Sequence, residues 1–108
     1  MISPKNFTLV SAQSMGATFT SSSIPMKYYY AVSLQAVWTG GTVDGTWRIL
    51  ISNDDVTYSA LTGSDSVASG AGDFYWDLTQ TTAGFVKITY IRNGGTGTAS
   101  VQVNGKTV

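Results

Sequence analysis

The residues of this chain that could carry acid–base or metal chemistry are six aspartates. The 108 residues include no histidine, no cysteine and no glutamate. Most enzymatic proton transfer uses His or Glu, and most structural zinc sites use Cys or His. We therefore expect a protein that acts by binding rather than by catalysis, with no cofactor and no bound metal.

The densest carboxylate cluster is the adjacent pair Asp54 and Asp55, which follows Asn53. A calcium loop needs more oxygen ligands in a fixed order, such as D-x-[DN]-x-[DN]-G. Hydrolysis by paired carboxylates needs two that face each other, and nothing in the sequence marks such a pair. Asn and Asp side chains bond to nearby backbone amides. We therefore predict a tight turn at this point.

The charge pattern excludes nucleic acid as a partner. The formal net charge is zero, and the six basic residues are scattered along the chain. A nucleic-acid binder needs clustered Lys and Arg to displace counterions. The first residues form no apolar leader, and no apolar run approaches the ~20 residues of a membrane span. We expect neither a secretion signal nor a membrane segment.

The elements that position these residues are predicted to be strands. β-branched and aromatic residues alternate with polar ones between clusters of Gly, Ser, Asn and Asp. The strands expected are 6–12, 16–20, 28–39, 46–53, 58–62, 73–78, 84–92 and 98–104, with a brief one near residue 67. This spacing predicts an antiparallel β-sandwich of about seven to eight strands, either immunoglobulin-like or a jelly roll.

Pairing and domain organisation follow from the same pattern. Strands 28–39 and 46–53 are predicted to form one hairpin, and strands 84–92 and 98–104 another. All 108 residues are expected to form a single domain. Residues 1–23 are either an extended N-terminal arm or edge strands.

Alternation along the strands separates a predicted core from predicted surfaces. Side chains two residues apart share a face of a strand. The core candidates are Trp38, Trp47, Trp76, Ile49, Ile51, Ile88, Tyr90 and Val101. Large rings outside this pattern are candidates for an interface, because interfaces favour aromatic residues. They are Phe7, Phe19, Tyr28 and Tyr29.

The segment 33–106 resembles a family of small bacteriophage virion proteins. The shared features, in order, are the strand Ser33–Gly40 (SLQAVWTG), Gly45-Thr46-Trp47, the turn Ser52-Asn53-Asp54 with Thr57-Tyr58, the run Val67–Trp76, Val86–Tyr90 with Arg92, Gly95-Thr96-Gly97 and Val103–Lys106. Asp55 stands where the family commonly has Gly, Tyr58 where it has Trp, and Lys87 where it has Arg. The resemblance implies no catalytic residues.

Two functional hypotheses follow. The resemblance implies a virion structural protein, assembled in the host cytoplasm, that serves as a head decoration, a spike or another minor component of the particle. The leading hypothesis is a decoration or accessory protein on the phage head. Its partners would be the major capsid protein or other virion proteins, and it would form a homo-oligomer, for example a trimer on a capsid axis. Residues 1–23 would contact the capsid or a neighbouring copy. The alternative is a carbohydrate-binding β-sandwich, which requires exposed aromatic rings on a shared face. An aspartate-based hydrolase is a remote third hypothesis.

Overall fold

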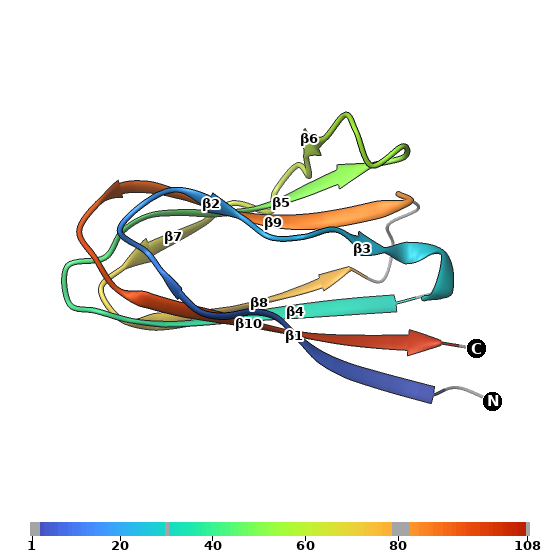
Figure 1. Cartoon of the computed structure of the whole chain (residues 1–108), viewed down its shortest axis with the longest axis horizontal. Helices are drawn as coiled ribbons and strands as arrows, with labels where there is room; N and C mark the ends of the chain where they lie inside the picture. The colour runs from blue at the N-terminus through green and yellow to red at the C-terminus, as the bar shows by residue number, and fades with distance from the viewer. Residues whose placement is uncertain (1–2, 30, 79–82, 108) are drawn as a thin grey trace.

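Alternating apolar and polar residues give this chain strands almost throughout. The computed structural model describes residues 3–29, 31–78 and 83–107 (Figure 1). One short 3₁₀ turn, η1 (Met26–Tyr28), interrupts the strands. The strands are β1 (Ser3–Ser14), β2 (Phe19–Thr20), β3 (Ile24–Pro25), β4 (Ala31–Thr39), β5 (Asp44–Ser52), β6 (Ser59–Ala60), β7 (Ser66–Ser69), β8 (Gly72–Leu78), β9 (Phe85–Gly94) and β10 (Thr98–Thr107).

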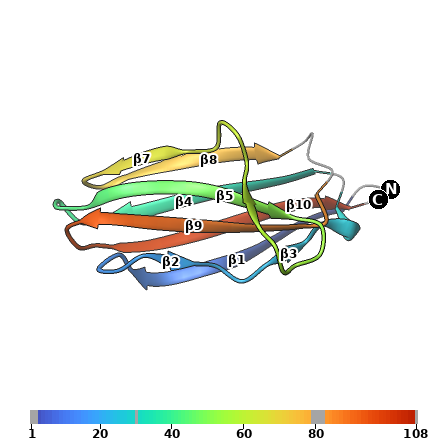
Figure 2. The ribbon, with the colours of Figure 1, turned by 90° about the horizontal axis from the view of Figure 1, so that it is seen from above.

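The strands form two antiparallel sheets that pack face to face (Figures 1 and 2). The four-stranded sheet has the order β1-β10-β4-β8. The second sheet has the order β2-β9-β5-β6, with β3 also paired to β9 and β7 also paired to β5. The predicted antiparallel β-sandwich is therefore confirmed.

The connectivity of the two sheets is that of a jelly roll. β2 and β3 lie along the same strand, β9, and β6 and β7 lie along β5, so each pair occupies one strand position. The chain then has eight positions, ordered 1-8-3-6 in one sheet and 2-7-4-5 in the other. This is the double-sheet jelly-roll arrangement. Of the two architectures expected from the sequence, the structure has the second.

Both predicted hairpins are wrong. β4 lies in the four-stranded sheet and β5 in the other, and β9 and β10 are divided in the same way. β4 instead pairs with β10, and β5 pairs with β9. A strand shows the same alternation whether the next strand lies beside it or across the core. The pattern therefore predicts which face is buried but not which strand is the partner.

The strand expected over 28–39 begins only at Ala31, because the 3₁₀ turn η1 occupies Met26–Tyr28. A second difference lies at the end of β5, where alternation from Ile49 predicts Ile51 inside the core and Ser52 outside it. Ser52 is buried and Ile51 is only partly buried. The Ser52 hydroxyl accepts the backbone N–H groups of Asp54 and Asp55, so the start of the turn draws Ser52 inward.

A cluster of aromatic rings fills the space between the sheets. Trp47 is fully buried, and its ring lies 5.1 Å from the ring of Tyr90, 5.8 Å from Trp38 and 6.5 Å from Trp76, measured between centroids. Ile49, Ile88 and Val101 are also fully buried around it. The indole N–H of Trp38 donates to the Gly70 carbonyl at 2.7 Å, so the core also anchors the turn that joins β7 to β8.

β1 forms an edge of the four-stranded sheet. It pairs with β10 from Ser3 opposite Thr107 to Ser14 opposite Thr98, with register shifts between Thr8 and Gln13. Residues 3–14 thus belong to the sandwich itself. The shifts twist the strand, which is one way that proteins discourage edge-to-edge association.

Candidate functional site

The aspartate pair singled out in the sequence forms a turn. A carboxylate oxygen of Asp54 accepts the backbone N–H groups of Val56 and Thr57, each at 2.9 Å, and the Ser52 hydroxyl at 2.9 Å. These hydrogen bonds, led by those from the backbone, lower the pKa of Asp54. Within residues 3–29, 31–78 and 83–107, no cluster of three or more carboxylate, His or Cys side chains could hold a metal ion.

Asp55 holds the same loop against its neighbours. It accepts a short hydrogen bond from the Tyr58 hydroxyl, and Ser23 donates to its other oxygen at 3.4 Å. The ammonium of Lys87 lies 4.4 Å from the centroid of the Tyr58 ring. Desolvation and the bond to Asp55 raise the pKa of Tyr58 to about 12. The cluster links the loop after β5 to the start of β3 and to β9.

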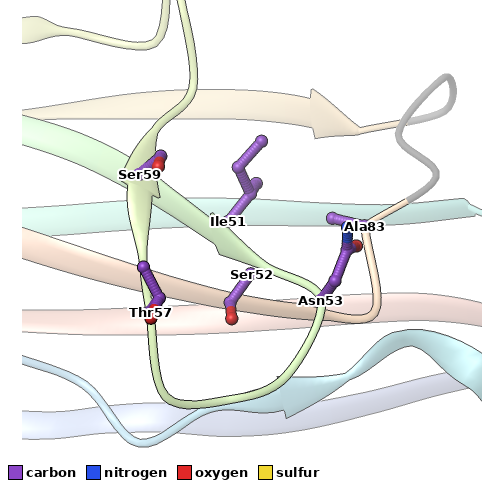
Figure 3. Close-up of a pocket in the computed structure, with 6 residues that line it drawn as sticks. All are labelled: Ile51, Ser52, Asn53, Thr57, Ser59 and Ala83. Atoms are coloured by element: carbon purple, nitrogen blue, oxygen red, sulfur yellow. The ribbon is translucent and has the colours of Figure 1, made fainter.

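A hollow of about 210 Å³ lies under this loop (Figure 3). Its lining residues are Ile51, Ser52, Asn53, Thr57, Ser59 and Ala83. None of these side chains ionises near neutral pH, so the hollow offers no acid, base or activated nucleophile. Nothing in this hollow favours catalysis.

The titratable groups predict a broad plateau of stability with pH. No His or Cys is present, so the chain contains no side-chain type whose ordinary pKa lies between about 5 and 9. Burial raises the pKa of Tyr90, and the pKa of Tyr58 is raised to about 12. The hydrogen bond from Arg48 lowers the pKa of Asp65, and that of Asp54 is also lowered.

The directions of these pKa shifts set the two ends of the pH range over which stability is expected to be constant. Raised tyrosine pKa values mean that the unfolded state loses protons first, so stability falls as pH rises from about 10 towards 12. Lowered aspartate pKa values mean that the unfolded state gains protons first, so stability falls below about pH 4. Urea unfolding across this range should show constant free energy from about pH 5 to 9. A transition near pH 7 would contradict the prediction.

The rings predicted at an interface lie at the margins of the core. Phe19 is half-buried, with its ring edge-on to Trp47 at 5.7 Å between centroids. Phe7 and Tyr29 are also half-buried and pack against the core. The side chain of Tyr28 lies outside the described residues. A contact with a partner through these rings stays a prediction.

Polar side chains cover much of the outer face of the four-stranded sheet. Inward residues of its central strand β4, such as Leu34 and Ala36, are fully buried, so the alternate residues point outward. Two rows of outward side chains cross all four strands in register. They are Asn6–Asn104–Ser33–Asp77 and Thr8–Gln102–Gln35–Tyr75. We call these eight residues the amide face.

The amide face is shallowly hollowed around Tyr75. One hollow of about 240 Å³ is lined by Asn6, Ser33, Gln35, Tyr75, Gln102, Val103 and Asn104. Another of about 170 Å³ is lined by Ala31, Val32, Ser33, Tyr75, Asp77, Asn104 and Lys106. Ser33, Tyr75 and Asn104 line both, so the two hollows adjoin. Tyr75 is 56% exposed.

Tyr75 was not among the sequence candidates, although a signal for it was present. In the run Phe74 to Leu78, alternation puts Tyr75 on the face opposite Trp76, which is buried. The amides that surround it come from β1, β4 and β10, far away in the sequence. Only the register of the sheet brings them together.

The fold and this surface define a jelly-roll β-sandwich with a polar, nearly neutral outer face. No protein-family model and no curated protein sequence matches the chain. The solved structure of the SPBc2 prophage-derived protein YomS is similar, with a TM-score of 0.66 and 14% identity over 97% of this chain and 96% of that one.

Two further solved structures share the fold. PirA gives a TM-score of 0.58 at 12% identity, covering 92% of this chain and 90% of that one. The tobacco streak virus coat protein gives 0.51 at 11% identity, covering 100% and 85%. At these identities the similarity establishes a common architecture. No helix in the described residues is long and apolar enough to span a membrane.

Proposed function

We propose that this protein is a structural component of a bacteriophage virion and decorates the phage head. The observation that carries the proposal is the jelly-roll strand order over the whole described chain. That order is a recurrent solution for viral capsid domains. A prophage-derived protein and a viral coat protein overlap with this chain over nearly its full length.

The surface chemistry supports a role in docking. Charged residues make up only 11% of the sequence, and the net charge is zero. The outer surface is therefore mostly hydroxyl, amide and apolar groups, among them the exposed side chains of Val56, Val67 and Phe74. Such a surface can lie against another protein without the cost of stripping water from many charges. The aspartates at 54 and 55 stabilise a turn, and the hollow beside that turn is lined by no ionisable side chain.

The proposed mechanism is multivalent attachment to the assembled head. Each contact of one small domain can be weak, but a symmetric oligomer that bridges neighbouring capsomers must break several contacts at once to leave. Binding the lattice but not its free subunits would also stabilise the particle by mass action. The partner is then the major capsid protein, and a trimer would match a threefold capsid axis.

The test is quantitative mass spectrometry of purified particles from the phage that encodes this chain. We expect the protein in a copy number comparable with that of the major capsid protein. Particles that lack it should release their DNA at a lower temperature. A few copies per particle would indicate a tail or vertex component, and absence from the particle would overturn the proposal.

A further inference from the structure

The amide face has the chemistry of a binding site for an uncharged ligand. The side chains of Asn6, Ser33, Gln35 and Asn104 hydrogen-bond to no other side chain among the described residues, whereas Gln102 donates to Thr8 at 2.8 Å. A primary amide offers two donors and one acceptor, and a hydroxyl offers both. The face therefore presents several unpaired donors and acceptors within a few strand spacings of one exposed ring.

The charges on this surface select against charged ligands. On the amide face, the hollow of about 170 Å³ is lined by one carboxylate, Asp77, and one ammonium, Lys106, whose formal charges cancel. The adjoining hollow of about 240 Å³ is lined by no charged side chain. A nucleic acid or an anionic polymer would need a cluster of basic groups, and a cation would need several carboxylates.

The same surface is a poor centre for a stable protein interface. Such interfaces depend on apolar or aromatic anchors that enter a dry pocket. On the amide face, Tyr75 is the single aromatic ring, and it stands among polar groups above shallow hollows. Val37, next to the face on β4, is 49% exposed, but the other large apolar residues of that strand, Val32, Leu34 and Trp38, are buried.

We propose that the amide face binds a neutral saccharide. A pyranose ring has an apolar C–H face, which packs on an aromatic ring, and hydroxyls that both donate and accept hydrogen bonds. Tyr75 supplies the packing surface for one sugar ring, which distinguishes this site from the platform of several exposed rings expected of a dedicated carbohydrate-binding β-sandwich. Gln35, Gln102 and Asn104 supply amide groups on the adjoining strands β4 and β10. This site is independent of head decoration, so either proposal can fail without the other.

The test is titration of the isotopically labelled protein with cellohexaose, xylohexaose, mannohexaose and maltohexaose, each to about 10 mM, followed by NMR. We expect at least one of these to shift the side-chain amide signals of Gln35, Gln102 and Asn104. Because the ligand is uncharged, the affinity should be unchanged in about 0.5 M NaCl. Polygalacturonate, an anionic polymer, should produce no shift.

Variants separate the site from general effects. Tyr75→Ala should weaken binding about tenfold, whereas Tyr75→Phe, which keeps the ring, should bind within about threefold of the original chain. Val67→Ala, on the second sheet and 76% exposed, is a matched surface control that should bind normally. Because Tyr75 is exposed, its variants should keep the thermal unfolding midpoint.

Three results would overturn the proposal. One is the absence of amide shifts with all four neutral oligosaccharides. Another is unchanged affinity in Tyr75→Ala. The third is shifts at these amides that depend only on protein concentration, which would make the amide face a contact between copies of this chain.

Discussion

Replacing Trp47 by alanine should destabilise the fold by about 3–5 kcal/mol, close to the largest cost of any single substitution here. Its indole is fully buried and touches the rings of Phe19, Trp38, Trp76 and Tyr90. Removing it leaves a cavity where both sheets meet. A domain of this size has a free energy of unfolding of about 5–15 kcal/mol, so the variant should lose a large share of its stability. Urea unfolding followed by circular dichroism measures the loss.

Two variants of the same cluster serve as controls. The indole N–H of Trp47 and the hydroxyl of Tyr90 are both buried without a hydrogen-bond partner among the described residues. Tyr90→Phe removes an unpaired hydroxyl and keeps the ring, so stability should change by no more than about 1 kcal/mol. Trp47→Phe keeps a ring in the cavity and should cost less than Trp47→Ala. Equal losses in all three variants would contradict a packing role for the indole.

Most of the local structure could be predicted from the sequence. Alternation placed Leu34, Ala36 and Trp38 on the inner face of one strand, and all three are buried. The Asn53–Asp55 turn also follows from residue type, because its hydrogen bonds join groups within a few residues. In both cases the determining interaction is local, or depends only on which side of a strand is apolar.

The pairing of strands could not be predicted in the same way. β4 pairs with β10, more than fifty residues later, although β5 follows it after four residues. The loops 40–43 and 95–97 are short enough for a hairpin and also long enough to cross between the sheets. The composition of the amide face could not be predicted either, because it also depends on strand pairing. Its two rows of side chains form only when β1, β10, β4 and β8 pair in register.

These crossing loops are the basis of the second large prediction. Gly95 has φ of +73°, and a Cβ at this position would overlap the carbonyl oxygen of Thr42 in the other loop. The same loops are joined by the Thr96 backbone N–H, which donates to the Thr42 hydroxyl at 3.1 Å. The backbones of the two crossing loops therefore approach closely only because Gly95 has no side chain.

Gly95→Ala should cost roughly 2–4 kcal/mol, because left-handed strain and displacement of the Thr42 loop add together. Gly63→Ala separates the two terms, since Gly63 has φ of +82° but open space around it, and should show the strain alone, about 1–2 kcal/mol. Gly41→Ala, in the opposing loop with no neighbour within 4 Å and no positive φ, should be nearly neutral. Thermal and urea unfolding of the three variants should give that order. If Gly95→Ala cost no more than Gly63→Ala, the two loops would not be in the contact that holds the crossings together.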